Sequence, residues 1–305
     1  MHELIIIGAG PAGLTAGIYA GRYRIDSLIL EKLGVGGQIV LSETIENFPG
    51  FPQPISTMEL MERFKKQLDN SGVPIREGEA TDILEAGGGS YVINTSAGSY
   101  ETKSVIVASG ASPRRLGIPG EEQFTGRGVS YCATCDGPLF KDKEVAVVGG
   151  GDRALEEALF LARYCRRVTL IHRRQELRAS RIMQEKVAGE KKIELLLESV
   201  VEKISGGARV ESLSVKNNKS SKVDDFKCNG VFIFVGIRPN TDFVKKLLHT
   251  DEAGFIMTDQ ESKTRREGVF ACGDCCKKEL YQVITASAEG ATAASAAHRY
   301  LLKSK

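Results

Sequence analysis

Short apolar runs alternate with amphipathic segments along the whole chain. An apolar run at Leu4–Ile7 enters the glycine turn GAGPAG, and a helix of small and apolar residues to about Tyr23 and a strand at Ser27–Leu30 follow. Apolar residues recur at helical spacing over about Thr57–Asn70, which predicts an amphipathic helix there. A strand, a glycine turn, a helix and a second strand in this order predict a βαβ unit.

The same order of elements occurs a second time near the middle of the chain. A strand, VAVVG, follows Glu144 and enters the turn GGGDRA; a helix then runs to about Tyr164, and the strand VTLIH comes next. The two glycine turns begin at Gly8 and Gly149. This internal duplication predicts two nucleotide-binding units and excludes a solenoid of short repeats.

The segments between and after these units carry weaker patterns. Residues 34–54 are rich in Gly and Pro and are predicted to form a loop. Further strands are expected around Val73–Ile75, Tyr91–Thr95, Val105–Ala108, Val231–Val235 and Val269–Asp274, with a hairpin near Gly87–Gly89. The last predicted helix is rich in Ala, Ser and Gly, as expected where a helix packs tightly against backbone or cofactor.

These elements predict an α/β protein of two Rossmann-like, three-layer domains. The turn-rich segment 109–128 and the sequence GIRPNT at Gly236–Thr241 mark the domain boundaries. We assign residues 1–115 and 246–305 to the domain of the first glycine turn and 116–245 to the domain of the second. The second domain is then an insertion into the first, an arrangement that periodicity alone does not prove.

Composition narrows the class of protein. With 305 residues, 42% of them apolar and 26% charged, the chain has the makeup of a globular protein with a sizeable core. Its net charge of +2 provides no strong attraction to nucleic acid or to an anionic membrane. We find no secretory leader and no stretch of about 18 apolar residues, so we expect a cytoplasmic protein. Seven cysteines are too few and too unevenly spaced for a secreted disulfide scaffold.

The first glycine turn has the sequence context of a dinucleotide site. Gly8, Gly10 and Gly13 follow a strand and open a helix, so the backbone can approach a pyrophosphate whose charge the helix N-terminus favours. Glu31, at the end of the next strand, is placed to accept hydrogen bonds from a ribose diol. An acid there suits an unphosphorylated ribose, as in FAD or NAD. An ordinary glycine turn, the alternative, leaves this combination of strand, helix and acid unexplained.

The second glycine turn predicts a different ribose. The turn contains Gly149, Gly151 and Ala154. The basic residues that follow the next strand are His172, Arg173, Arg174 and Arg178. Arginines at the ribose end make planar, multi-donor contacts with a phosphate, so this site is predicted to prefer NADPH over NADH. A solvated basic face is the alternative, and the spacing from the glycine turn favours the phosphate site. Two sites with opposite ribose preferences predict an oxidoreductase that uses FAD and NADPH. The FAD-binding domain is then 1–115 and 246–305, and the NADPH-binding domain is 116–245.

A cysteine pair lies just before the second nucleotide unit. Cys132 and Cys135 are separated by two residues, a spacing that lets the two sulfurs join in a small ring. If the pair starts a helix, the helix dipole would lower the pKa of the first thiol and help it attack a substrate disulfide. Asp136 is a candidate to carry the proton that thiol–disulfide exchange must move.

The remaining cysteines raise the alternative of a zinc site, since two C-x-x-C pairs are a common zinc pattern. The second pair, Cys272 and Cys275, lies far beyond the spacing of a compact zinc ribbon, so we predict no metal site. Cys165 and Cys228 are isolated and are predicted to be buried structural thiols. For the adjacent Cys275 and Cys276, packing or surface placement is favoured over a redox role.

Motifs spread over essentially the whole chain accompany these sites: GAGPAG, GGQ, ENFPG, VIVASG, PRRLGIPGE, CATCDG, GGGDRALEEA, HRRQELR, GIRPNT, ACGD and YQVITA. In this order and spacing they resemble the low-molecular-weight, bacterial-type thioredoxin reductases. The resemblance implies a homodimeric thioredoxin-disulfide reductase that passes electrons from NADPH through FAD and the cysteine pair to oxidised thioredoxin. It also implies that Cys135 lies beside the flavin, that Cys132 attacks thioredoxin and that Asp136 donates the proton.

The resemblance assigns further residues to the cofactors. Toward FAD it adds Pro11, Ala12, Gly37, Gln38, Asn47, Ser109, Gly110, Asp274, Gln282 and Val283. Toward NADPH it adds Asp152, Arg153 and Ile237. Arg153 departs from the family, which usually has Ser or Thr there, and is expected either to add a phosphate contact or to crowd the turn.

Related functions stay open as alternatives. A ferredoxin-dependent reductase or a dithiol oxidase is expected to lack the phosphate-binding arginines, which this chain keeps. A reductase of another thioredoxin-like or glutaredoxin-like protein is not excluded, because the resemblance alone names the recipient. Outside the enzymes, a flavin-bound redox sensor would use the cysteine pair only to report redox state.

Overall fold

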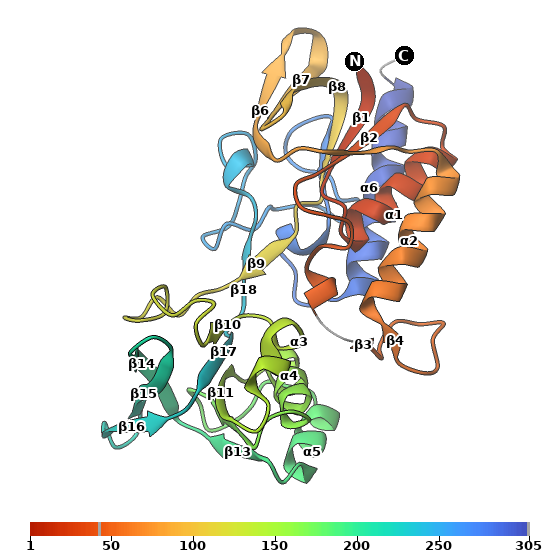
Figure 1. Cartoon of the computed structure of the whole chain (residues 1–305). Helices are drawn as coiled ribbons and strands as arrows, with labels where there is room; N and C mark the ends of the chain where they lie inside the picture. Colours follow the sequence, from red (N-terminus) through yellow and green to blue (C-terminus); the bar gives the residue numbers. More distant parts are fainter. Residues whose placement is uncertain (42–43, 304–305) are drawn as a thin grey trace. The chain divides into compact units, whose positions relative to one another are not determined.

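The computed structural model describes residues 1–41 and 44–303 and divides the chain into two units (Figure 1). Unit 1 comprises Met1–Ser112 and Arg238–Lys305, and unit 2 comprises Pro113–Ile237. The chain crosses between the units twice, and the crossing segments pair as a two-stranded sheet of β9 (Ala111–Pro113) and β18 (Ile237–Pro239). Unit 2 is therefore inserted into unit 1.

Unit 1 is built on a seven-stranded sheet with the order β5-β2-β1-β8-β7-β6, in which β19 also pairs with β8. Its strands are β1 (His2–Ile7), β2 (Ser27–Glu31), β5 (Ile75–Glu77), β6 (Ala80–Ala86), β7 (Ser90–Thr95), β8 (Gly98–Val107) and β19 (Val269–Ala271). The pairings among β5, β2, β1, β8 and β19 are parallel, whereas β6, β7 and β8 form an antiparallel meander. The predicted hairpin is confirmed, with the short helix η2 (Gly87–Gly89) at its tip.

Two cores cover the two faces of this sheet. Successive side chains of a strand point to opposite faces, so Leu4 and Ile6 join one core and Ile5 and Ile7 the other. Figure 1 shows that the helices lie together on one face: α1 (Pro11–Arg22), α2 (Thr57–Ser71) and α6 (Val283–Lys303). A Cβ on Gly290 of α6 would lie 2.2 Å from the carbonyl oxygen of Ala12, which explains the small residues of this helix.

Unit 2 repeats this plan on a smaller scale, with an all-parallel sheet of the order β10-β17-β11-β12-β13. Its strands are β10 (Val129–Ser130), β11 (Glu144–Gly149), β12 (Arg167–Ile171), β13 (Ile193–Leu196) and β17 (Gly230–Phe234). On one face pack α3 (Ala133–Asp136), η3 (Gly137–Phe140), α4 (Asp152–Ala162) and α5 (Arg181–Gly189). An antiparallel sheet covers the other: β14 (Ser199–Gly206), β15 (Val210–Asn217) and β16 (Val223–Lys227). The predicted α/β class with two Rossmann-like layered domains is confirmed.

Some local expectations were wrong. The predicted loop over 34–54 contains η1 (Gly37–Leu41) and β3 (Thr44–Ile45), which pairs with β4 (Ile55–Ser56); residues 42 and 43 of that loop lie outside the described residues. Residues 238–245, assigned above to the inserted domain, fall in unit 1, and residues 113–115, assigned above to the first domain, fall in unit 2. The physical reason is packing, because Val244 of η4 (Asp242–Val244) is fully buried in the unit 1 core.

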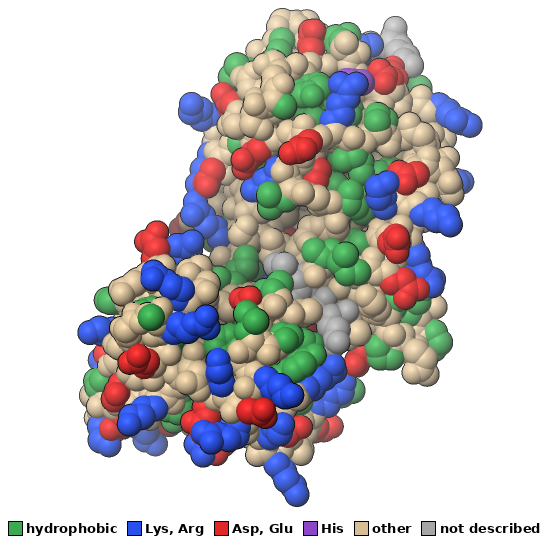
Figure 2. Space-filling view, in the orientation of Figure 1, with side chains coloured by type: hydrophobic (Ala, Val, Ile, Leu, Met, Phe, Trp, Pro, Cys, Tyr) green, Lys and Arg blue, Asp and Glu red, His purple; other side chains and the backbone are tan. Residues whose placement is uncertain are grey.

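The surface carries mixed charge. Figure 2 shows Lys and Arg side chains interspersed with Asp and Glu side chains over the visible face, as expected for a net charge of +2. Among the described residues, no helix has the length and apolar character needed to cross a membrane.

Candidate functional site

The first glycine turn connects β1 to α1 in unit 1. Gly10 is the N-cap of α1 and Pro11 its first residue, so the unpaired N–H groups of the helix start face the turn. A Cβ on Gly13 would lie 1.8 Å from the carbonyl oxygen of Gly8. Only glycine allows the helix to start this close to the strand, and the resulting concave backbone suits an anionic phosphate.

Glu31, the last residue of β2, is held beside this turn. Its Oε2 accepts a hydrogen bond of 2.7 Å from the Ala9 N–H, and its Oε1 accepts one of 3.0 Å from the Leu33 N–H. These bonds orient the carboxylate at the carboxyl end of the sheet, next to the glycines. The structure thus brings together the two parts of the predicted FAD site; the contact of Glu31 with a ribose stays a prediction.

The other residues predicted for FAD come from distant segments of unit 1. The Asn47 amide donates a 3.1 Å hydrogen bond to Oε1 of Gln282, although 235 positions separate them. Gln282 directly precedes Val283, the first residue of α6. Gly37 and Gln38 lie on η1, where the neighbouring Gly36 N–H bonds the carbonyl of Ala9 at 2.9 Å. Asn47 and Gln282 are paired and η1 is tied to the glycine turn, contacts that the sequence alone did not predict.

Two more predicted positions, Ser109 and Gly110, follow β8 and are organised by Asn240. Ser109 Oγ donates to the Asn240 carbonyl at 2.7 Å, and the Asn240 N–H donates to the Gly110 carbonyl at 3.0 Å. Asp274 lies on η5 (Gly273–Cys275), after β19. Asn240 was not recognised from the sequence, since nothing in its local pattern relates it to a segment 131 residues earlier.

The second glycine turn connects β11 to α4 in unit 2. A Cβ on Gly149 would lie 2.5 Å from the carbonyl oxygen of Phe234 on β17, so glycine is needed here as well. Gly151 is the N-cap of α4, and a Cβ placed on it would meet no atom within 4 Å, so the space above it is open. Asp152 Oδ1 accepts hydrogen bonds from the Ser180 N–H at 2.8 Å and from its hydroxyl at 2.6 Å. This contact ties the loop 173–180 to the start of the helix.

The basic residues of this loop lie next to the turn. The Arg178 N–H donates a 2.7 Å hydrogen bond to the Gly150 carbonyl, and the side chains of Arg173, Arg174 and Arg178 are exposed. None of these three guanidinium groups forms an ion pair with an acid in the described part of the chain. Arg178 is thus held at the glycine turn, and Arg173 and Arg174 are exposed on the same loop directly after β12.

His172 differs from these arginines because its ring is buried beneath the turn. Its Nε2 lies 3.1 Å from the Glu176 carbonyl, and a Cβ on Gly150 would lie 2.2 Å from its Nδ1. Burial lowers the pKa of His172, and the charges of Arg178 and Arg173 act in the same direction, so the ring is neutral at pH 7. The ring supports the glycine turn from below, and its predicted cofactor contact stays a prediction.

The cysteine pair forms a disulfide at the start of α3. Cys132 and Cys135 are bonded, with their Cα atoms 5.4 Å apart, and Cys132 is the N-cap residue. The Cys135 N–H donates a 3.1 Å hydrogen bond to the Cys132 sulfur. After reduction the same N–H would stabilise a Cys132 thiolate. This single donor, rather than a helix dipole, would provide the stabilisation, because α3 has only four residues. Cys132 is buried and Cys135 is exposed.

The other cysteines are buried. Burial raises the pKa of Cys165 to about 11 and that of Cys228 to about 12, so both stay protonated at pH 7, and the prediction of buried structural thiols is confirmed. Cys275 and Cys276 lie in the unit 1 core, so packing rather than surface placement is the correct interpretation. No group of three His, Cys, Asp or Glu side chains among the described residues is arranged to hold a metal ion.

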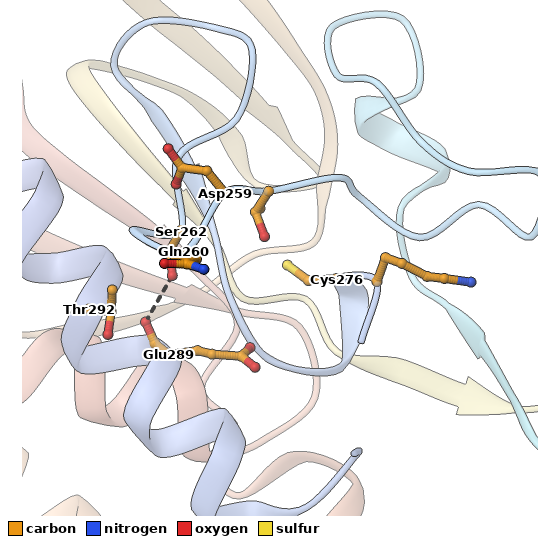
Figure 3. A pocket seen from close by; sticks show the side chains of 8 residues that line it. Asp259, Gln260, Ser262, Cys276, Glu289 and Thr292 are labelled. Atoms are coloured by element: carbon orange, nitrogen blue, oxygen red, sulfur yellow. Dashed lines mark hydrogen bonds between the residues drawn. The ribbon is translucent and has the colours of Figure 1, made fainter. Parts of the chain in front are cut away.

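A pocket of about 370 Å³ lies elsewhere in unit 1, and none of the predicted site residues lines it (Figure 3). Asp259, Ser262, Cys276 and Glu289 are among its lining residues. Its carboxylates are already engaged: Asp259 Oδ1 accepts from the Lys263 N–H at 2.9 Å, and Glu289 accepts from the Gly273 N–H at 2.8 Å. Backbone N–H groups therefore hold both of these carboxylates in place.

Comparison with known proteins gives matches over the whole chain. The pyridine nucleotide-disulphide oxidoreductase family matches residues 2–290. The thioredoxin reductase of Peptoclostridium acidaminophilum is 43% identical over 307 residues, which cover 99% of this chain and 97% of that protein. The thioredoxin reductase of Treponema pallidum is 43% identical over 300 residues, covering 98% and 97%. The crystal structure of Lactococcus lactis thioredoxin reductase matches with a TM-score of 0.97 at 41% identity, covering 99% of this chain and 100% of that one.

Proposed function

This chain belongs to the pyridine nucleotide-disulphide oxidoreductase family, and we propose that it acts as a thioredoxin reductase. Electrons then pass from NADPH, through FAD, to the Cys132–Cys135 disulfide and on to oxidised thioredoxin. The observation that carries the proposal is the disulfide itself. It lies in the same unit as a glycine turn and three exposed arginines, which form no ion pair in the described part of the chain. A second glycine turn with an oriented acid lies in the other unit.

The residues of each turn fit the cofactor proposed for it. In unit 1 the open backbone at Gly10 would accommodate a pyrophosphate, and Glu31 would accept hydrogen bonds from an unphosphorylated ribose, which suits FAD. In unit 2 Arg173, Arg174 and Arg178 offer donors to a ribose 2′-phosphate, which suits NADPH. When bound, a flavin supplies the hydride chemistry that the side chains lack, since it accepts a hydride from reduced nicotinamide and reduces a disulfide.

The chain's own residues carry out the disulfide exchange. The Cys132 thiolate attacks one sulfur of the thioredoxin disulfide, which forms a mixed disulfide and releases one thioredoxin thiolate. Cys135 then attacks the Cys132 sulfur, which reforms the intramolecular disulfide and releases the second thiolate. Asp136 is proposed to supply the proton to a leaving thiolate. Since Cys132 is buried in its oxidised form, a protein substrate reaches it only once its sulfur becomes exposed.

We also propose that the enzyme is a cytoplasmic homodimer. Both statements rest on the resemblance to thioredoxin reductases. The five cysteines outside the redox pair are all free thiols, which fits a reducing compartment. Analytical ultracentrifugation of the purified protein tests the dimer directly, and a monomer at micromolar concentration would contradict it.

A coupled assay tests the proposed function. The purified, flavin-loaded protein should oxidise NADPH in the presence of several thioredoxin-like proteins, with multiple turnovers per enzyme, whereas NADH should support much slower turnover. Equal activity with NADH would contradict the role of the arginines. Flavin reduction by NADPH without turnover of any protein disulfide would instead favour the redox sensor, and a preference for a glutaredoxin-like protein would correct the recipient.

A reciprocal pair of glycine substitutions tests the two cofactor assignments separately. In Gly10→Ala the new methyl group would lie 3.9 Å from the nearest protein atom, and Gly151→Ala meets none within 4 Å, so both variants should fold. The methyl groups should instead meet the pyrophosphates. We expect Gly10→Ala to weaken flavin retention about tenfold or more and Gly151→Ala to weaken NADP⁺ binding by a similar factor.

Flavin absorbance per protein and NADP⁺ titration measure these effects, and circular dichroism verifies folding. Each variant is the control for the other. Loss of flavin in Gly151→Ala with retention in Gly10→Ala would reverse the assignment of the two sites.

A further inference from the structure

Glu157 lies on α4 between the glycine turn of unit 2 and the segment that carries the disulfide. Its side chain is only 5% exposed, although its neighbour Glu156 is exposed. Ala133, the first residue of α3, is buried in one core with α4, and its N–H acts on the Glu157 carboxyl group to lower its pKa. Ala133 directly follows Cys132, so a buried acid on the nucleotide-site helix holds the backbone of the redox segment.

Arg153, one turn earlier on α4, is the cation that faces this acid. Its Nε lies 3.8 Å from Glu157 Oε1, which is within ion-pair range and too long for a hydrogen bond. Its guanidinium lies over the Phe234 ring, with its carbon 5.6 Å from the ring centroid. Nε and Nη2 of Arg153 and Oε1 of Glu157 are buried, and none of them has a hydrogen-bond partner among the described residues. Unmet donors in a buried position cost free energy, so Arg153 has more to gain from a new acceptor than from its present neighbours.

A nucleotide would provide that acceptor. Arg153 is the second residue of α4 and lies two positions after the N-cap Gly151. A pyrophosphate is expected at this helix start, and the Arg153 side chain is 34% exposed. Phosphate oxygens form strong, charge-assisted hydrogen bonds with guanidinium groups. Binding should therefore draw Arg153 away from Glu157.

The charge on Glu157 depends on this cation. Burial raises the pKa of Glu157 to about 7; Arg153 opposes the rise, Glu156 adds to it, and the Ala133 N–H opposes it. Both charge states are therefore present near pH 7. Withdrawal of Arg153 removes an interaction that stabilises the ionised form, so the pKa rises further and the carboxylate takes a proton from solvent.

We propose that Glu157 is a positioning residue that couples the nucleotide site to the redox segment, and that it binds a proton when a dinucleotide phosphate draws Arg153 away. This inference rests on the proposed function, because it requires a nucleotide at the second glycine turn. The neutral carboxyl group keeps an oxygen for the Ala133 N–H, but the bond loses its charge assistance. Nucleotide binding thereby loosens the first turn of α3, where Cys132 is the N-cap.

Calorimetric titration of the flavin-loaded enzyme with NADP⁺ at pH 7, in buffers of different ionisation enthalpy, measures the proton directly. We expect uptake of about half a proton per site, because a group with a pKa near 7 is about half ionised at that pH. Glu157→Gln should abolish the uptake, and the exposed acid Glu185→Gln on α5 should leave it unchanged. Arg153→Ser should also abolish it, because Glu157 without its cation is already neutral, and this variant retains the buried acid if Glu157→Gln folds poorly.

Hydrogen exchange of the segment around Ala133 provides the second readout. NADP⁺ should increase exchange there in the natural protein and in Glu185→Gln, and have a smaller effect in Glu157→Gln. The role of Glu157 would be overturned if NADP⁺ binding caused equal proton uptake in the natural protein and in Glu157→Gln. The same change in hydrogen exchange in both proteins would also overturn it. Failure of NADP⁺ to bind any of these proteins would instead contradict the proposed nucleotide site.

Discussion

Replacement of Cys135 by Ser should lower thioredoxin turnover by about 10³-fold or more, while NADPH still reduces the bound flavin. The reason is that the variant cannot form the Cys132–Cys135 disulfide, so the flavin has no disulfide through which to pass electrons. When residues act together in catalysis, replacement of one of them lowers the rate about as much as replacement of all of them. Stopped-flow measurement of flavin bleaching by NADPH, alongside steady-state thioredoxin reduction, separates the two half-reactions.

The direction of the relay is tested by the same variant. With Cys135 absent, a Cys132 thiol that attacks thioredoxin has no partner to release the mixed disulfide, so a covalent complex should accumulate when the reduced variant meets oxidised thioredoxin. Cys132→Ser should not trap this complex. Cys228→Ala is the matched control, since that buried thiol lies in the same unit and takes no part in the relay. Trapping by Cys132→Ser alone would reverse the roles assigned to the two sulfurs.

The double substitution Arg173→Ala with Arg174→Ala should reduce kcat/KM for NADPH by about 100-fold and leave kcat/KM for NADH nearly unchanged. Both side chains are exposed on the loop that directly follows β12, and hydrogen bonds to charged groups contribute about 1.5–3 kcal/mol each. NADH has no 2′-phosphate and makes no contact of this kind, so its kcat/KM should stay nearly the same. Steady-state kinetics with the two nucleotides measures the change in preference.

Two arginines at the opposite end of β12 supply the control. Arg166 pairs with Glu144 and Arg167 with Glu194, and both arginines are exposed on unit 2. Replacement of Arg166 and Arg167 by Ala removes the same net charge from the same unit, so a general electrostatic effect would appear in both double variants. An equal loss for NADH and NADPH in the Arg173 and Arg174 variant would show that these side chains do not read the phosphate.

The central strands could be predicted because they are buried on both faces. Such strands form continuous apolar runs, as in β1 and β11, and the glycine turns that follow them are bounded by strand and helix. The antiparallel sheet of unit 2 was not recognised, and its geometry explains why. β14 contains register shifts, so Val201 and Ile204, three positions apart, both face the core and break the alternation expected of a half-buried strand.

The candidate site was predictable to the extent that its chemistry is local in the sequence. The disulfide spacing, the glycine turns and the arginines that follow β12 all lie within short segments. The contacts that organise them do not: Asn47 pairs with Gln282, and the Asn240 amide bonds the backbone carbonyl of Ser109. No local pattern relates such distant positions, so these pairings require the folded chain.

By itself, the sequence determined the α/β class, the two nucleotide-binding units and the redox pair, because backbone geometry at a phosphate turn and at a C-x-x-C disulfide constrains residue types within a few positions. Only the tertiary structure decided that residues 238–245 pack with unit 1 and that His172 is buried beneath the glycine turn. It also decided that Glu157 contacts both Arg153 and the backbone next to Cys132. Burial and charge coupling depend on which helices pack together, and packing joins segments that are not neighbours in the chain.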